Sequence, residues 1–242
     1  MSIQNLGGNQ KKWTGLVNNK RVYIKTSSSE RGKVWYECES ECVASRLAIA
    51  MGIPQVINYY LDTLVFKNKE YKVCVSYDFV CSGEFKYFNS IAPYASRLSG
   101  EEKYMYIVSQ LPQLKSRIDT ILLFDSIIGN EDRHLRNLGI VQTAGIGYYI
   151  PLFDCGNSMF YNKSQKYIQT MLKTDLDLLP CKPFYSTHQS QLRLCDLSLV
   201  QIKPVYKEQV YRIVNSFYTG ERAKLICKFL ISRLRRYNLL WN

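Results

Sequence analysis

The chain lacks several features that mark membrane, secreted and metal-binding proteins. It contains no run of about 18 consecutive apolar residues, so we expect no membrane-spanning helix. Its N-terminus has no basic segment followed by an apolar one, so the sequence predicts no secretory leader. The eight cysteines are scattered and include no Cys-x-x-Cys pair. We therefore expect reduced, mostly buried thiols in a cytoplasmic protein.

Acidic residues are also scarce relative to basic ones. There are 32 Lys and Arg against 20 Asp and Glu, a formal net charge of +12. Such a charge favours a polyanionic partner such as a nucleotide, a nucleic acid or an acidic protein, although a basic solvated surface would give the same count. Hydrophobic residues make up 46% of the 242 residues, which is enough for a packed core in one large domain or in two lobes.

The stretch from residue 125 to 158 carries the strongest chemical pattern. Asp132 is followed five positions later by Asn137, and Asp154 comes directly after an apolar segment. We predict a hairpin of strands 138–142 and 148–153, which would return Asp154 to the loop that carries the other two. Phosphoryl transfer from ATP uses a carboxylate for the proton of the attacking hydroxyl, and an Asn and a second carboxylate for magnesium. Each residue alone is common in turns, but together they predict a small ATP-dependent kinase.

A second pattern lies near the N-terminus. The loop consists of Gly7, Gly8, Asn9, Gln10, Lys11 and Lys12. Its glycines permit close backbone approach, so its amides and lysines could hold phosphates. Strands are predicted at 13–17 and 21–26, and alternation puts Val22 and Ile24 on one face and Lys25 on the other. A strand lysine after a glycine loop is the arrangement with which kinases hold the α- and β-phosphates.

The elements that follow are predicted from periodicity. A helix is expected at 36–51, ending at Gly52, and its Glu41 could either pair with Lys25 or only favour the helix dipole. Strands are expected at 56–60, 64–66 and 71–80, and the backbone from Tyr77 to Phe79 could meet an adenine edge. Helices are expected at 101–112, 114–129, 205–218 and 221–237.

Two basic regions have open interpretations. Residues 159–198 are expected to be irregular, and their lysines suit an activation or substrate-binding segment as well as an ordinary surface excursion. These lysines are Lys163, Lys166, Lys173 and Lys182. In the last helix, Arg233, Arg235 and Arg236 are expected to form a solvated face.

The sequence resembles a known kinase family. Asp-Arg-His-Leu-Arg-Asn at 132–137, ahead of Phe-Asp-Cys-Gly at 153–156, resembles the HipA-like serine/threonine kinases. The same core is distantly similar to that of the phosphoinositide kinases. Residues 7–12 are similar to the HipA-like glycine loop, and 41–54 to the helix that ends in Gly-x-Pro. The resemblance spans residues 5 to 155, and the remainder matches by helical character alone.

The resemblance implies an α+β, two-lobed protein-kinase-like fold. Residues 1–82 would form a β-rich N-lobe, and residues 83–242 a mainly helical C-lobe. Asp132 would be the catalytic base, while Asn137 and Asp154 would complete the catalytic set and bind Mg²⁺. Together with Tyr77 and Phe79, which are expected from their placement alone, the residues expected to bind ATP are Gly7, Gly8, Asn9, Gln10, Lys12, Lys25 and His134.

The resemblance also implies a biological role. Family toxins carry a further subdomain before the glycine loop, so we expect a compact form here. Family members phosphorylate cytosolic proteins and often themselves, but Asn5 stands where a self-phosphorylated serine is expected. The expected substrate is an aminoacyl-tRNA synthetase or another translation factor, and the expected partner is a DNA-binding antitoxin. Two alternatives stay open, a phosphoinositide-type lipid kinase and a non-catalytic basic module that binds nucleotide or DNA.

Overall fold

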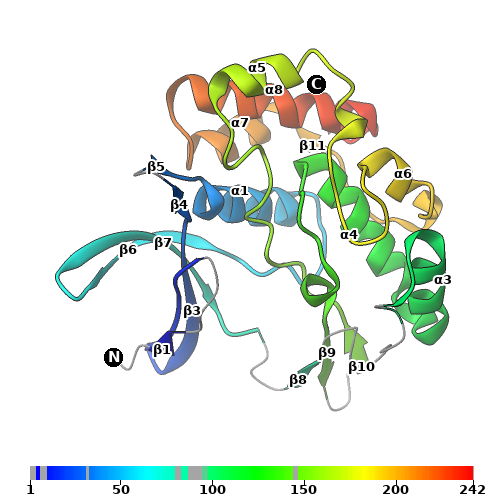
Figure 1. The fold of residues 1–242 in the computed structure, drawn as a ribbon, viewed down its shortest axis with the longest axis horizontal. Helices are drawn as coiled ribbons and strands as arrows, with labels where there is room; N and C mark the ends of the chain where they lie inside the picture. The colour runs from blue at the N-terminus through cyan, green and yellow to red at the C-terminus, as the bar shows by residue number, and fades with distance from the viewer. Residues whose placement is uncertain are drawn as a thin grey trace.

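The computed structural model describes residues 4–5, 10–30, 33–79, 83–86, 95, 97–143 and 147–241. Its N-terminal part is built on a five-stranded antiparallel sheet of order β1-β2-β3-β7-β6 (Figure 1). The strands are β1 (Gln4–Asn5), β2 (Lys12–Val17), β3 (Lys20–Thr26), β6 (Tyr60–Phe66) and β7 (Lys69–Tyr77). A separate short hairpin joins β4 (Ser29–Glu30) to β5 (Lys33–Val34).

The strands predicted at 13–17 and 21–26 are confirmed, and β2 and β3 pair in a hairpin that turns at Asn18–Asn19. Asn18 and Asn19 have φ values of 50° and 60°, which Asn tolerates better than most residues. Val22 and Ile24 are buried with Trp13 on one face of the sheet, as the alternation predicts. Lys25 points to the opposite face, where helix α1 packs.

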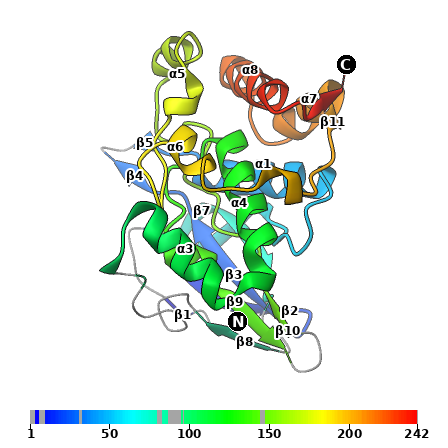
Figure 2. The same cartoon turned by 90° about the vertical axis from the view of Figure 1, so that its right-hand side faces the viewer.

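Helix α1 (Glu37–Ala50) lies between the sheet and the C-terminal helices (Figures 1 and 2). It confirms the helix predicted at 36–51, and it ends where Gly52 takes a φ of +70°. The strand predicted at 56–60 is wrong. Val56 makes only an isolated parallel bridge to Leu152, and the paired strand begins at Tyr60.

Helices dominate the C-terminal part. They are α3 (Gly100–Gln110), α4 (Lys115–Ile128), α5 (Gln165–Met171), α6 (His188–Leu192), α7 (Lys207–Asn215) and α8 (Gly220–Arg236). The strands are β8 (Gly83–Lys86), β9 (Ile140–Thr143) and β10 (Gly147–Tyr149) in one sheet, and β11 (Val205–Tyr206) paired in parallel with β12 (Leu240–Trp241). The predicted α+β class, with a strand-rich N-terminal and a helix-rich C-terminal part, is confirmed.

Helix α4 is the centre of the C-terminal core. Every residue from Ile118 to Ile128 is buried, so the helix is enclosed on all sides rather than along the single stripe that its periodicity predicts. Helix α8 packs against it, with Phe229 and Leu230 fully buried. Figure 2 shows α4 running through the middle of the helical part. The end of this helix therefore gives the loop that follows a rigid starting point.

Two expectations about the C-terminal part need correction. Residues 159–198 are not simply irregular, because they contain α5, α6 and two single 3-10 turns. Arg233 is buried rather than solvated, since Asp177 pairs with it and the Ser126 carbonyl accepts from its Nε. Arg235 and Arg236 are exposed, as expected. None of the helices in the described ranges is long and apolar enough to cross a membrane.

Candidate active site

The loop after α4 is shaped by its own side chains. Gly129 closes the helix in the left-handed region at φ +62°. Asn130 then donates from Nδ2 to Asp125 Oδ1 at 2.9 Å, and its Oδ1 accepts from the Asp132 amide at 3.2 Å. These bonds turn the chain, so that Asp132 lies outside the core directly after the end of α4.

Arg133 anchors this loop to helix α4. Its guanidinium is fully buried and makes a two-pronged ion pair with Asp125, at 2.8 Å from Nε and 3.0 Å from a terminal nitrogen. It also donates to the carbonyls of Asn137, at 3.1 Å, and Phe153, at 2.6 Å. Burial alone would lower the pKa of Arg133, but Asp125 outweighs burial and raises it. One cation thus joins α4, the loop and the segment that leads to Asp154.

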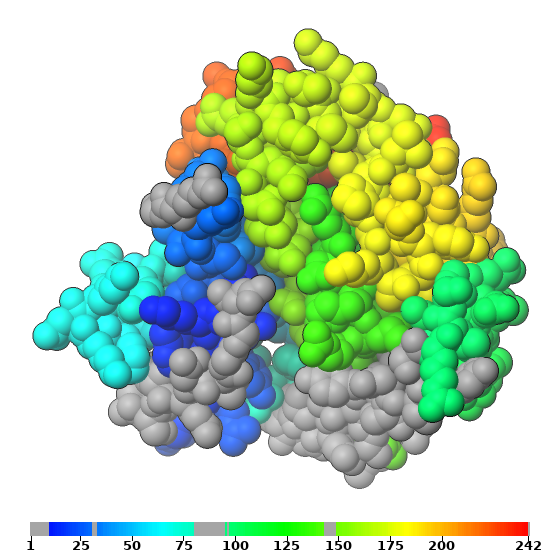
Figure 3. All heavy atoms as spheres, viewed as in Figure 1, coloured from blue at the N-terminus to red at the C-terminus, as the bar shows by residue number. Residues whose placement is uncertain are grey.

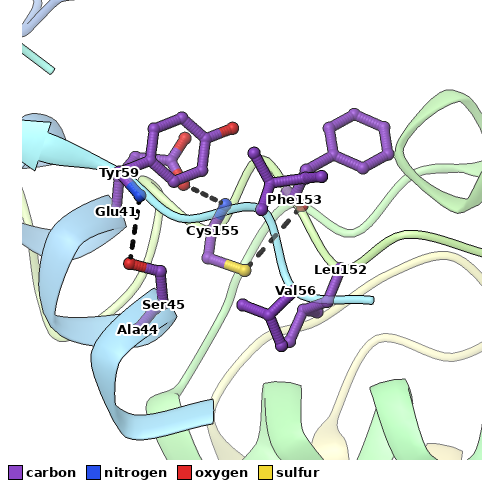
Figure 4. A pocket seen from close by; sticks show the side chains of 9 residues that line it. Glu41, Ala44, Ser45, Val56, Tyr59, Leu152, Phe153 and Cys155 are labelled. Carbon is purple, nitrogen blue, oxygen red and sulfur yellow. Dashed lines mark hydrogen bonds between the residues drawn. The ribbon is translucent and has the colours of Figure 1, made fainter. Parts of the chain in front are cut away.

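Asp154 is held in an unusual backbone conformation. Its φ is +57°, which is strained for a residue other than glycine and is often found at functional sites. Lys25 Nζ lies 2.7 Å from Asp154 Oδ1 and 3.0 Å from Glu41 Oε1. Glu41 also accepts from the Cys155 amide at 2.8 Å, as the dashed line in Figure 4 shows. Of the two alternatives for Glu41, the pairing with Lys25 is the one observed.

Lys25 and Asp154 each favour the charged form of the other. Burial lowers the pKa of Lys25, but the carboxylates of Asp154 and Glu41 outweigh burial and raise the pKa well above its ordinary value. Burial raises the pKa of Asp154, yet the charge and hydrogen bond of Lys25 hold it well below its usual range. Lys25 and Asp154 are therefore both ionised at neutral pH. The Tyr59 ring centroid lies 5.3 Å from Lys25 Nζ, and Figure 4 shows this ring beside the Glu41 side chain.

A cavity of about 320 Å³ opens in front of the cluster. Figure 3 shows this face, with the N-terminal segments in blue beside segments of the C-terminal part in green and yellow. Six of the predicted site residues line the cavity together. The full lining is Gln10, Lys12, Ser28, Glu37, Glu41, Asp132, His134, Arg136, Asn137, Asp154, Gly156, Asn157 and Tyr161.

The other predicted residues lie elsewhere. Lys25 does not line the cavity, but it is bonded to two residues that do, Asp154 and Glu41. Tyr77 is 46% exposed, and Phe79 packs on Phe153 with ring centroids 5.4 Å apart. Neither lines the cavity, and the Phe79 carbonyl accepts from the Tyr149 hydroxyl at 3.3 Å. Gly7, Gly8 and Asn9 lie outside the described residues.

Asp132 has two partners that sequence reasoning missed. Lys182 Nζ lies 2.7 Å from its Oδ1, and Asn157 donates to its Oδ2 at 3.2 Å. Asn157 stands three residues after Asp154, so its proximity to the motif was a signal. Lys182 lies 50 residues beyond Asp132 in sequence, and only its membership of a basic segment pointed to it.

The fold is shared with solved kinase structures. A Helicobacter pylori proinflammatory kinase, CtkA, matches with a TM-score of 0.72 and 20% identity over 97% of this chain and 92% of that chain. The chain has a kinase-like fold. Shewanella oneidensis HipA, solved with HipB and operator DNA, matches with a TM-score of 0.52 and 12% identity over 96% of this chain and 65% of its own. Hydra Fam20 with sugar matches with a TM-score of 0.51 and 11% identity over 96% and 84%.

Comparison of the sequence with known families and proteins identifies no relative. No protein-family model matches the chain, and no curated protein matches it significantly. The likeness to the kinases therefore lies in the fold.

Groups at the cavity suit the phosphates of a nucleotide and a divalent cation. Asn137 donates from Nδ2 to the Asp132 carbonyl at 3.3 Å, which leaves its amide oxygen for a metal, and Lys25 takes one oxygen of Asp154. Two oxygen donors with room for phosphate oxygens and water match the preference of Mg²⁺. The described residues contain no group of three or more His, Cys, Asp or Glu that could hold a metal ion.

His134 is the remaining predicted residue at the cavity. Burial lowers the pKa of its imidazole, so the ring is neutral at neutral pH. Its Nδ1 is buried and has no hydrogen-bond partner among the described residues. A neutral ring with one unused nitrogen can hydrogen-bond a ligand without adding charge.

Proposed function

We propose that the chain is an ATP- and Mg²⁺-dependent serine/threonine protein kinase of HipA type. The observation that carries the proposal is that Asp132, Asn137 and Asp154 line one cavity, with Asp154 held by the Lys25–Glu41 pair. These are the groups that phosphoryl transfer requires, in positions where one bound triphosphate can meet all of them. The two lobes are residues 1–82 and 83–242, with the cavity where they meet.

Each residue then has a distinct role. Asp132 orients the acceptor hydroxyl and receives its proton. Asn137 and Asp154 hold Mg²⁺, which neutralises phosphate charge when it is bound. Lys25 holds the phosphates from the sheet side. Gln10, Lys12 and the preceding residues 7–9 cover the phosphates, His134 contacts the nucleotide, and the backbone at Tyr77 and Phe79 borders the adenine.

The biological setting belongs to the same proposal. The HipA neighbour was solved with HipB and its operator DNA, within a toxin–antitoxin system. By analogy, the chain is a cytoplasmic growth regulator whose partner is a DNA-binding antitoxin. Its substrate is a protein such as an aminoacyl-tRNA synthetase or another translation factor. Because Asn5 stands at the expected serine position, any self-phosphorylation would fall elsewhere, as at Ser27–Ser29.

The chemistry is tested by transfer of label from ATP. Purified protein with Mg²⁺ and γ-labelled ATP should label itself or an added cytosolic protein fraction. Asp132→Asn and Asp154→Asn should each reduce labelling by roughly 10²- to 10⁴-fold, because each removes a carboxylate that acts in transfer. Asp62→Asn, the same change on exposed strand β6, is the matched control and should label normally. Normal labelling by either cavity variant would count decisively against a kinase.

A further inference from the structure

Lys182 makes an ion pair that fold stability does not explain. Its ammonium lies 2.7 Å from Asp132 Oδ1, and the two side chains are 58% and 32% exposed. Exposed pairs of this kind contribute little to stability, because solvent screens them and two long side chains must be ordered. The pair nevertheless involves Asp132, the carboxylate that we propose receives the proton of the acceptor hydroxyl.

The backbone that carries Lys182 is firmly held. Gln191 is 1% exposed and brackets the residue from both sides, donating from Nε2 to the Lys182 carbonyl at 3.0 Å and accepting from the Phe184 amide at 3.1 Å. An antiparallel bridge between Pro180 and Thr187 closes the same loop. A fixed backbone with an exposed, long side chain presents a cation that can move between nearby anions.

Two other cations near the loop are committed elsewhere, and Lys12 and Arg136, which line the cavity, form no ion pair with Asp132 among the described residues. Lys25 is bound to Asp154 and Glu41, and Arg133 is fully buried against Asp125. In the part of the chain that the structure describes, Lys182 is the cation that forms an ion pair with the Asp132 carboxylate. This carboxylate and a bound triphosphate are both anions that must come close together for transfer, so a mobile cation between them lowers their repulsion.

We propose that Lys182 is a catalytic residue, which neutralises Asp132 at rest and stabilises the charge of the phosphoryl group as it is transferred. The inference rests on the proposed kinase function. In the step, the acceptor hydroxyl oxygen bonds to the γ-phosphorus. The bond from that phosphorus to the β,γ-bridging oxygen breaks, and its electron pair leaves on ADP. The hydroxyl proton passes to Asp132, and Lys182 stays protonated throughout.

The test separates catalysis from binding. Turnover and the affinity for fluorescent ADP are measured for wild type, Lys182→Ala and Lys182→Arg. Lys173→Ala is the control, because Lys173 is an exposed lysine of the same segment that has no ion pair among the described residues. We expect Lys182→Ala to lose about 10²-fold in kcat, as for removal of one group that stabilises transition-state charge, with ADP affinity unchanged. Lys182→Arg should keep part of the activity, and added ethylammonium should partly restore Lys182→Ala.

Each other outcome overturns the inference. Wild-type turnover in Lys182→Ala would show that the contact is incidental, and faster turnover would show that Lys182 blocks the site. Lost ADP affinity and a lower melting temperature without amine rescue would show a structural role only. An inactive wild type would overturn the kinase proposal as well, whereas an active wild type with an unaffected Lys182→Ala removes only the role of Lys182.

Discussion

Asp125 and Arg133 are both 0% exposed, and each is the counter-charge of the other. A buried pair is not necessarily stabilising as a whole, but loss of one partner leaves an uncompensated charge in the core. We therefore expect Asp125→Ala to lower the free energy of unfolding by about 3–5 kcal/mol. Urea denaturation monitored by circular dichroism would measure it.

The matched control is an ion pair on the surface. Glu221 and Lys224 lie 3.8 Å apart on α8, with side chains 44% and 74% exposed. Glu221→Ala should change stability by no more than about 0.5 kcal/mol. If the two variants lost similar free energies of unfolding, the role of Arg133 in anchoring the loop would be contradicted.

At the scale of elements, two helix ends share a conformation but differ in their surroundings. Gly129 ends α4 and Gly220 begins α8, with φ values of +62° and +59°. A Cβ at Gly129 would lie 2.9 Å from Phe229 Cζ, whereas a Cβ at Gly220 would meet nothing within 4 Å. Alanine at either site incurs the left-handed backbone cost of about 1–2 kcal/mol. Only Gly129→Ala adds overpacking, which typically costs about 1–3 kcal/mol more.

We expect Gly129→Ala to lower stability by that additional amount relative to Gly220→Ala. It should also weaken nucleotide binding, since Gly129 sets the direction of the loop that carries Asp132. Chemical denaturation and titration with fluorescent ADP measure the two effects. Equal losses of stability in the two variants would mean that Phe229 shifts to accommodate the added Cβ without a cost in free energy.

Elements with strong local signals were predictable, and those held by distant partners were not. The apolar period of α1 and the alternation of the strand that contains Lys25 lie within short windows, and both elements were located correctly. Strand β8 exists through its pairing with β9, more than fifty residues later, and α6 is too short to show a helical period. The strand predicted at 56–60 does not form, because Val56 makes only an isolated bridge, to Leu152.

The same division holds for the whole molecule. Spacing around the hairpin was enough to predict that Asp132, Asn137 and Asp154 face one cavity, because the hairpin itself brings them together. The burial of Arg233 depends on Asp177, 56 residues away, and the contact of Lys182 with Asp132 spans 50 residues. Such pairs form only when the complete chain has folded, and no local pattern encodes them.

The acid stability of the whole protein should depend on His188. This side chain is 1% exposed, and neither ring nitrogen has a partner among the described residues. Burial, aided by the charge of Arg233, lowers its pKa to about 3. Its pKa in the unfolded chain is about 6.5, so between these values the unfolded state binds more protons and stability falls as pH falls. From pH 7 to pH 5 the loss from this group is about 2 kcal/mol.

His188→Leu removes this titration and should therefore lose less stability than wild type between pH 7 and pH 5. Urea unfolding of both proteins at the two pH values measures the difference. Asp154 and Asp177 also have lowered pKa values, but carboxylates of this kind cost stability mainly below about pH 4, outside the chosen window. His134, the only other histidine, titrates in both proteins and cancels in the comparison. Equal losses in the two proteins would mean that His188 gains access to water or a partner before the protein unfolds.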